Sequence, residues 1–232
     1  MNSTTALPIR GAIFDMDGTL MDSMPIWEEV GTRYLRSKGV TAPDDLYERI
    51  KAMSLPQAAE YIRAQFGVRD ETTQIVRDVN SLLVDFYGHE AKPKPGARAL
   101  LKALQAAGIP MCIASNTDER LVRLTLQSND LLRFFRSILT CAAMQTDKND
   151  PLIFETAARK LGVDKESAVV FEDADHAIFT AAAAGFPVLA VYDASMAEAQ
   201  EEIRRRADLY CRSLTELDLT AISGPAPVIR RR

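Results

Sequence analysis

Short apolar runs alternate with amphipathic segments over most of the chain, and this alternation constrains the fold more than any other feature. The runs lie at residues 12–14, 109–114, 137–141, 168–171, 187–191 and 207–211. Their length and apolar character are typical of strands that are buried on both faces. From residue 97 onward, the segments between them have helical spacing. Repeated strand–helix units of this kind predict an α/β fold with a doubly wound parallel sheet.

One long segment interrupts the alternation after the first strand. Residues 22–91 contain four stretches with helical spacing and no convincing strand. Residues 92–96, Lys-Pro-Lys-Pro-Gly, follow as a stiff connector. We therefore expect a core domain formed by residues 1–21 and 92–232, and an inserted all-helical domain over residues 22–91. The Gly- and Pro-containing tail from about residue 223 is expected to be loose.

Charge and composition argue against several classes of protein. The net charge of −4 gives no sign of a nucleic-acid partner. No apolar stretch approaches the roughly 20 residues that a membrane helix needs, and the first residues lack the features of a secretory signal. Cys112, Cys141 and Cys211 are widely spaced, which favours buried, reduced thiols in a cytoplasmic protein. Nothing in the sequence indicates the oligomeric state.

Polar residues gather where the predicted strands end. In chain order they are Asp15 and Asp17, then Ser115, Asn116 and Thr117, then Lys148, then Glu172 and Asp173. The carboxyl ends of parallel strands share one edge of a sheet, and ligands bind there. Two carboxylates about 4 Å apart repel by roughly 4 kcal/mol at an effective dielectric constant near 20. Four carboxylates at one edge therefore predict a bound cation.

These residue types suit phosphoryl transfer. Mg²⁺ prefers oxygen ligands from a few carboxylates, waters and a phosphate. Asp15 can act as a nucleophile that forms an aspartyl-phosphate. Asp17 can protonate the leaving oxygen and later deprotonate the attacking water. Ser115, Asn116 and Lys148 can hold the transferring oxygens.

Each of these signals also has an ordinary structural explanation. Ser115-Asn116-Thr117 could be a helix cap, Lys148 a solvated side chain, and Glu172-Asp173 a favourable helix N-terminus. Their joint occurrence at the ends of successive strands favours the functional interpretation. Of the two histidines, His89 is expected at the surface, and His176 remains a candidate for the site because it follows the acidic pair.

The pattern resembles the haloacid dehalogenase superfamily, in the branch with a helical cap inserted after the first motif. The matching residues are Asp15-Met16-Asp17-Gly18-Thr19, Ser115-Asn116, Lys148 and Glu172-Asp173, and the resemblance covers about residues 9–212. It implies a Rossmann-like core and a helical cap over residues 22–91. It also implies Mg²⁺ held by Asp15, the backbone carbonyl of Asp17 and Asp173, with Glu172 supporting the metal through water. Thr19 joins the expected phosphate-binding residues.

Two departures from the superfamily pattern affect loops and spare the charged groups. Lys148 is followed by Asn149-Asp150-Pro151, where the branch often has Lys-Pro-x-Pro. Ala174 and Ala177 stand where serine and glycine are frequent. The resemblance therefore leaves the details of the phosphate loop open.

The carboxylate at Asp17 favours phosphate esters, because the dehalogenases and phosphonatases of the superfamily lack an acid there. We expect a Mg²⁺-dependent phosphatase that hydrolyses a small phosphomonoester, such as a sugar phosphate, through an aspartyl-phosphate. One alternative is a mutase resembling β-phosphoglucomutase. The cap loop of that mutase resembles Lys51-Ala52-Met53-Ser54 of this chain. In the mutase an arginine follows and binds the second phosphate of the substrate, whereas this chain has Leu55 there. A lost cap cation favours the phosphatase.

A second alternative is a non-enzymatic, receiver-like phosphoacceptor protein, which also pairs acidic residues with a Ser or Thr and a Lys on such a sheet. The helical insert and the second aspartate of the first motif argue against it. Substrate preference is expected to depend on the cap, and the candidates, which could equally be cap core or hinge, are Met24, Trp27, Lys51, Met53 and Ser54.

Overall fold

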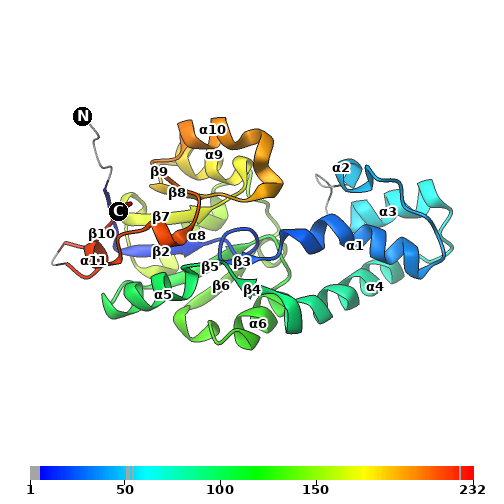
Figure 1. Cartoon of the computed structure of the whole chain (residues 1–232), viewed down its shortest axis with the longest axis horizontal. Coiled ribbons are helices and arrows are strands. Elements are labelled where there is room, and N and C mark those ends of the chain that lie inside the picture. Colours follow the sequence, from blue (N-terminus) through cyan, green and yellow to red (C-terminus); the bar gives the residue numbers. More distant parts are fainter. Residues whose placement is uncertain (1–5, 51–52, 54, 225) are drawn as a thin grey trace. The chain divides into compact units, whose positions relative to one another are not determined.

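The structure is a computed structural model that describes residues 6–50, 53, 55–224 and 226–232 (Figure 1). The chain divides into two compact units. One comprises the residues up to Asp22 together with Lys92–Arg232, and the other comprises Ser23–Ala91. This division lies one residue from the expected boundary after residue 21. No helix within the described ranges is both long and apolar enough to cross a membrane.

The larger unit is built on a sheet of six parallel strands. Its strands are β2 (Gly11–Phe14), β5 (Met111–Ser115), β6 (Ser137–Thr140), β7 (Ala168–Glu172), β8 (Val188–Val191) and β9 (Leu209–Cys211). Their order across the sheet is β6-β5-β2-β7-β8-β9. β2, the first of these strands in the sequence, therefore lies centrally. The chain winds outward from it in both directions, as in a Rossmann-like sheet. The predicted α/β, doubly wound fold is confirmed.

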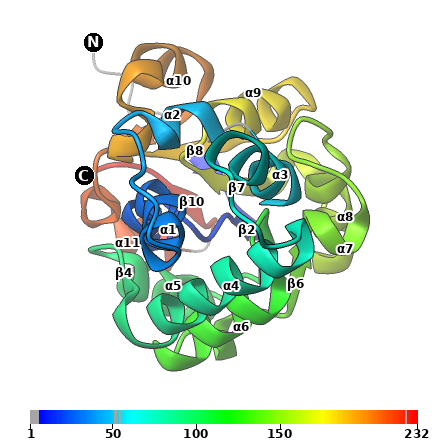
Figure 2. The ribbon, with the colours of Figure 1, turned by 90° about the vertical axis from the view of Figure 1, so that its right-hand side faces the viewer.

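Helices cover both faces of this sheet (Figures 1 and 2). On one face lie α8 (Leu152–Leu161), α9 (Asp175–Ala183) and α10 (Gln200–Arg206), which pack on Ile13, Val170 and Val188. The opposite side carries α5 (Ala97–Ala106) and α6 (Glu119–Ser128). Successive side chains of a strand point to opposite faces of the sheet, so each face presents its own apolar side chains to the helices that cover it.

Aromatic packing anchors the central strand beside the predicted site. Phe14 of β2 stacks on Phe171 of β7, with ring centroids 4.2 Å apart, and both side chains are fully buried. Burying an aromatic side chain of this size stabilises a fold by about 1.5–3 kcal/mol. The residues that directly follow Phe14 and Phe171 are Asp15 and Glu172, so this stack fixes the strand ends from which two of the predicted acidic groups project.

Short elements complete the larger unit. They are β1 (Leu7–Pro8), β3 (Met21–Asp22), β4 (Lys92–Pro93), α7 (Cys141–Met144), α11 (Leu219–Ile222), β10 (Val228–Ile229) and 3₁₀ turns at Leu132–Phe134, Lys165–Ser167, Ala194–Ala199 and Leu214–Glu216. The connector expected over residues 92–96 begins as β4, which pairs antiparallel with β3. The third predicted strand ends one residue early, because Thr140 caps α7 by accepting the N–H of Ala143 at 3.3 Å.

The prediction of a loose C-terminal tail is wrong for its last residues. β10 pairs antiparallel with β1, and the side chain of Ile229 is fully buried. The Arg230 guanidinium also pairs with Asp218 at 2.8 Å. One glycine and two prolines stand in the first five residues of this tail. The apolar pair that follows is nevertheless enough to bury one side chain and to pair with β1.

The smaller unit contains helices throughout its described part. They are α1 (Met24–Ser37), α2 (Leu46–Ile50), α3 (Leu55–Phe66), α4 (Thr72–Asp85) and a π-helical turn at Phe86–Glu90. Buried side chains at helical spacing form its core, among them Tyr34, Ile62 and Ile75. An ionic cluster ties the end of α1 to α4, because the Lys38 ammonium lies 2.7 Å from Asp70 and 2.8 Å from Asp78.

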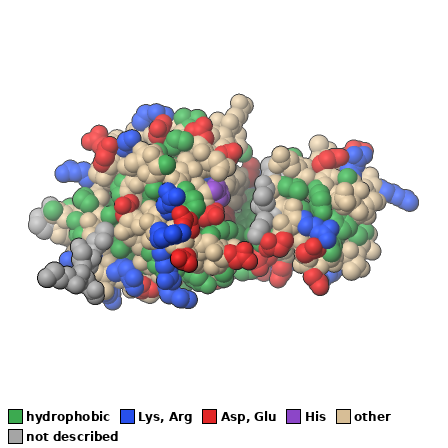
Figure 3. Space-filling model, turned by 90° about the horizontal axis from the view of Figure 1, so that it is seen from above, with side chains coloured by type: hydrophobic (Ala, Val, Ile, Leu, Met, Phe, Trp, Pro, Cys, Tyr) green, Lys and Arg blue, Asp and Glu red, His purple; other side chains and the backbone are tan. Residues whose placement is uncertain are grey.

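Basic side chains lie among acidic ones on the face of the larger unit seen in Figure 3. The longest internal basic run, Arg204–Arg206 at the end of α10, is an example. Glu202, one turn earlier in the same helix, pairs with both Arg205 and Arg206. The run is therefore an ion-paired helix surface.

Candidate functional site

The registers of three strands bring the predicted site residues to one edge of the sheet. β2 lies between β5 and β7, with Phe14 opposite Ile113 on one side and Phe171 on the other. The ladder continues past the strand, since the Asp15 N–H donates to the Phe171 carbonyl at 2.9 Å. Asp15, Ser115 and Glu172 thus emerge next to one another, at the point where ligands bind in open α/β sheets.

Three buried carboxylates meet at this edge. The side chains of Asp15, Glu172 and Asp173 offer oxygen atoms that all lie within 4.8 Å of one another. Their residues are only 6%, 1% and 3% exposed. Water can screen such groups very little, so their mutual repulsion has to be balanced by cations or by protonation.

Lys148 supplies one of these cations. It lies in the turn between α7 and α8 and is 3% exposed. Its ammonium donates to both Asp15 Oδ1 and Glu172 Oε1. The structure therefore brings the lysine that follows the third strand into direct contact with the acids that follow the first and the fourth.

Backbone and hydroxyl donors orient the other oxygens of the cluster. Glu172 Oε2 accepts the N–H groups of Asp173 at 2.9 Å and Ala174 at 3.0 Å. Thr19 is fully buried, and its hydroxyl donates to Asp173 Oδ1 at 2.7 Å. Thr19 therefore holds the Asp173 carboxylate, and the phosphate contact expected for it stays a prediction.

Burial dominates the electrostatics of the site. It raises the pKa of Asp15, and the nearby charges of Glu172 and Asp17 raise it further, against the opposing effect of Lys148. The pKa of Asp173 is raised well above its ordinary value, first by burial and then by the charges of Glu172 and Asp15. Burial alone would lower the pKa of Lys148, but the two carboxylates it contacts outweigh this and raise it.

The acidic cluster fits a divalent cation. If all four groups are ionised, Asp15, Glu172 and Asp173 carry three negative charges and Lys148 one positive charge, which leaves two negative charges to be balanced. Carboxylate oxygens are the ligands that Mg²⁺ prefers. The raised pKa values of Asp15 and Asp173, which come first from burial and then from the neighbouring negative charges, fit a site that needs a cation.

Gly18 makes room for this cluster. Its φ of +77° is in the left-handed region, and a Cβ built there would lie 2.3 Å from Asp173 Oδ2. We expect Gly18→Ala to displace the Asp173 carboxylate and to lower kcat by at least about tenfold, since small misplacements of catalytic groups are costly.

Gly108→Ala is the matched control for this substitution. Its φ is +71°, but no atom lies within 4 Å of the added Cβ, so it carries the backbone strain without the clash. Thermal unfolding of Gly108→Ala should show a loss of roughly 1 kcal/mol from the left-handed conformation, and Gly18→Ala should lose at least as much. Equal activities in steady-state kinetics would contradict the role given to Gly18.

A second group of polar contacts lies beside the first. Asp17 is partly exposed, and its Oδ2 accepts the Thr117 hydroxyl at 2.6 Å. The Ser115 side chain accepts the Thr117 N–H at 3.0 Å, which leaves the serine proton available for another acceptor. The Asn116 side chain is exposed. Asp17, Ser115 and Asn116 therefore border the buried cluster on the side of β5.

One buried pair at this edge escaped the sequence analysis. Asp193 follows β8 and is 6% exposed, and its Oδ2 accepts the Lys94 ammonium at 2.7 Å. The same ammonium donates to the Tyr192 carbonyl at 2.9 Å. The charge of Asp193 contributes to the raised pKa of Asp173. An acid two residues after the fifth predicted strand was the signal that could have revealed it.

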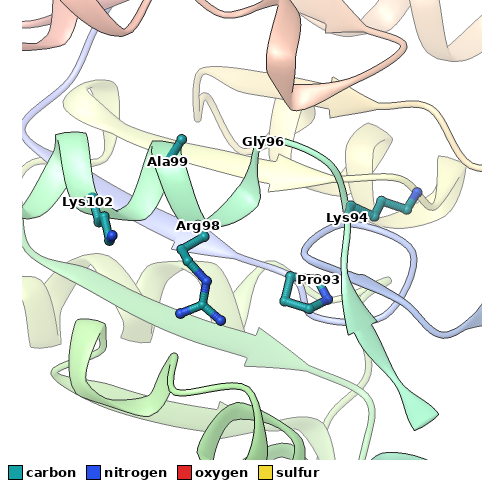
Figure 4. A pocket seen from close by; sticks show the side chains of 6 residues that line it. All are labelled: Pro93, Lys94, Gly96, Arg98, Ala99 and Lys102. Carbon is teal, nitrogen blue, oxygen red and sulfur yellow. The ribbon is translucent and has the colours of Figure 1, made fainter.

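A hollow at the start of α5 contributes little to this site. It is lined by Pro93, Lys94, Gly96, Arg98, Ala99 and Lys102 (Figure 4). Figure 4 shows Lys94 pointing away from Arg98 and Lys102. Lys94 is committed to Asp193, and an Arg98 Nη atom donates to the Asn129 carbonyl at 2.5 Å. Two of the basic residues of the hollow, Lys94 and Arg98, thus have structural partners.

The remaining sequence candidates belong to α9 and to the smaller unit. His176 is exposed on α9, with its Nδ1 3.5 Å from Asp175. In the smaller unit, the Trp27 indole donates to the Tyr87 hydroxyl at 2.9 Å, and Met24 and Met53 are half-buried. Lys51, Ala52 and Ser54 lie outside the described residues.

All three cysteines are buried and free, and burial raises the pKa of each. A raised pKa keeps a thiol protonated and unreactive at neutral pH. The expectation of reduced, buried thiols agrees with this.

Known proteins resemble this chain in sequence and in fold. A model of the haloacid dehalogenase-like hydrolase family matches residues 12–191. The chain is 27% identical to a phosphorylated carbohydrates phosphatase of Thermotoga maritima, over 76% of this chain and 82% of that protein. It is 28% identical to hexitol phosphatase A of Escherichia coli, over 91% of this chain and 94% of the relative.

A solved structure extends the comparison to three dimensions. The crystal structure of a protein described as a putative β-phosphoglucomutase from Thermotoga maritima superposes with a TM-score of 0.74. The two are 25% identical, and the match covers 88% of this chain and 94% of the other.

Proposed function

Because the chain belongs to the family of haloacid dehalogenase-like hydrolases, we propose that it is a Mg²⁺-dependent phosphatase of a small sugar phosphate. The observation that carries this proposal is the buried cluster of Asp15, Glu172 and Asp173 with Lys148 in contact. The relatives support the substrate class, since the names of two of them describe phosphatases of phosphorylated carbohydrates and of hexitols.

In the first step, an Asp15 carboxylate oxygen attacks phosphorus and forms the aspartyl-phosphate. The bond from phosphorus to the sugar oxygen breaks, and this oxygen takes a proton from the Asp17 carboxyl group. Ser115 and Asn116 hold the transferring oxygens as hydrogen-bond donors. Lys148 balances the negative charge, since its ammonium already lies against Asp15.

In the second step, the Asp17 carboxylate takes a proton from water, and the water oxygen attacks phosphorus. The bond from phosphorus to Asp15 breaks, which releases inorganic phosphate and restores the carboxylate. Mg²⁺ would be held by Asp15, Asp173 and the Asp17 backbone carbonyl, with Glu172 in support, and would neutralise the charge of the phosphoryl oxygens. The smaller helical unit is proposed to act as the cap that selects the substrate.

Release of inorganic phosphate is the test of this proposal. We expect the purified protein to hydrolyse p-nitrophenyl phosphate with Mg²⁺, and a panel of hexose and hexitol phosphates to include a better substrate. Conversion of β-glucose 1-phosphate into glucose 6-phosphate without free phosphate would instead identify a mutase. A stable phosphoprotein that does not turn over would identify a phosphoacceptor. Either result would overturn the phosphatase assignment.

Metal removal should abolish turnover and lower stability together. After treatment with EDTA and desalting, we expect no phosphate release until Mg²⁺ is restored. Mg²⁺ at about 100 times its Kd should stabilise the fold by about 2.7 kcal/mol. Differential scanning calorimetry should show this increase in wild type and in the exposed control Asp44→Asn, but not in Asp173→Asn. An equal Mg²⁺ effect in Asp173→Asn would contradict the metal site.

A further inference from the structure

Thr117 lies one residue beyond the predicted phosphate-binding pair and contacts the proposed acid/base residue. It is 6% exposed, and its hydroxyl donates to Asp17 Oδ2 at 2.6 Å. Hydroxyl-to-carboxylate bonds of this length belong to the strong, charge-assisted class. A partly exposed aspartate next to a sheet edge has several rotamers, and such a bond selects one of them.

The register of the sheet makes this contact possible. Ile13 of β2 pairs with Cys112 of β5, so residues 99 apart in sequence lie opposite each other. Asp17 and Thr117 are 100 apart and follow the same two strands. The pair therefore sits where the ladder ends, directly beyond its last hydrogen bonds.

Hydrogen bonds on both sides restrain the backbone of Thr117. The Ser115 hydroxyl oxygen accepts the Thr117 N–H at 3.0 Å, which closes a small turn. Asp118 then caps α6 by accepting the Arg120 N–H at 2.9 Å, so the next residue is also fixed. Thr117 thus donates to Asp17 from a backbone that is restrained on both sides.

We propose that Thr117 is a positioning residue that aims the Asp17 carboxyl group at the leaving oxygen of the substrate. This inference rests on the proposed phosphatase function. With the hydroxyl bound to Oδ2, the rotamer of Asp17 is fixed before substrate arrives, and proton transfer to the leaving oxygen requires no side-chain search. Removing the hydroxyl leaves the acid in place but takes away the donor that holds its Oδ2.

Such a role depends on the leaving group. A nitrophenolate ion is a weak base and departs with little help from an acid, whereas phenolate is a stronger base and needs the proton more. The two aryl phosphates have nearly the same shape, so a disturbed binding site would affect them alike. The value of kcat/KM is the correct measure, because it includes the departure of the leaving group and excludes hydrolysis of the aspartyl-phosphate.

The test compares Thr117→Val with wild type on phenyl phosphate and p-nitrophenyl phosphate. Well-placed general acids contribute about 10²–10⁴-fold, and we expect partial misplacement to cost at least about tenfold on phenyl phosphate. On p-nitrophenyl phosphate we expect a loss of less than about threefold. Thr117→Ser, which keeps the hydroxyl, should recover most of the activity on phenyl phosphate. Thr117→Ala carries the same expectation as Thr117→Val if the valine variant does not fold.

Thr125→Val is the matched control. Thr125 in α6 is fully buried, and its hydroxyl has no hydrogen-bond partner among the described residues. The same change of atoms there should leave both kcat/KM values unaltered. Equal losses on the two esters in Thr117→Val, or no recovery in Thr117→Ser, would overturn the positioning role while leaving the phosphatase intact. A wild-type protein that hydrolyses neither ester would overturn both proposals.

Discussion

Asp15→Asn should reduce phosphate release by at least about a thousandfold, because the substitution removes the proposed nucleophile. The fold should survive the change. Asp15 is buried among like charges that raise the pKa of its carboxyl group, so a neutral amide of the same shape relieves repulsion. Steady-state phosphate release is the measurement, and far-ultraviolet circular dichroism with thermal unfolding checks the fold.

Asp44→Asn provides the control for this prediction, since Asp44 is an exposed residue of the smaller unit and stands outside the carboxylate cluster. It should keep wild-type turnover. Acid quenching during turnover should trap a phosphoprotein in wild type and in the control, but none in Asp15→Asn. Turnover of Asp15→Asn within about tenfold of wild type would mean that Asp15 is not the nucleophile.

Lys148→Met should cost both activity and stability. It removes the ammonium that Asp15 and Glu172 share and leaves two buried carboxylates without that partner. Removing one partner of a buried ion pair destabilises proteins by about 3–5 kcal/mol. For a chain of this size, that corresponds to a fall in Tm of roughly 10 °C. Activity should fall at least about a hundredfold, because the charge that faces the transferring phosphoryl group is lost.

Two further variants separate the causes. Lys102→Met makes the same change at an exposed position of α5 and should leave Tm and turnover near wild type. The double variant Lys148→Met/Glu172→Gln also removes the Glu172 charge that Lys148→Met leaves unpaired. It should therefore regain part of the lost stability while staying inactive. Unchanged unfolding of Lys148→Met in denaturant titrations would show that these contacts contribute nothing to the fold.

The positions of the charged groups could be predicted from the sequence because each follows a buried strand. Parallel pairing makes strand ends converge, so Asp15, Lys148, Glu172 and Asp173 were expected together before any distance was known. The structure places the four in contact with one another or within one cluster. Their catalytic and metal-binding roles remain predictions, which the experiments above test.

Contacts that depend on a particular side-chain direction could not be predicted in the same way. The Thr19 hydroxyl donates to Asp173, 154 residues away in the sequence, and spacing along the chain did not reveal this contact. The pairs Thr117–Asp17 and Lys94–Asp193 likewise depend on the register of strands and on loop geometry. Spacing along a chain shows which residues reach an edge, and it does not show which neighbour each one will contact there.

The C-terminal tail was mispredicted for a related reason. Its glycine and prolines indicate a loop, and the two apolar residues Val228 and Ile229 are too few to form a recognisable strand pattern. Their partner, Leu7–Pro8, lies at the other end of the chain. A two-residue ladder between the ends of a chain has no local signature, and its stability comes from the burial of Ile229.

The short ribbon of β3 and β4 has an evolutionary consequence. Asp22 and Lys92 are partners in this antiparallel pair, and such partners have Cα atoms about 5 Å apart. The residues between them therefore leave and re-enter the core at nearly the same point. A tight hairpin or a different module could close the same gap without disturbing the sheet. Ancestral genes could thus exchange this insert as a cassette, acquiring new substrates while inheriting the chemistry unchanged.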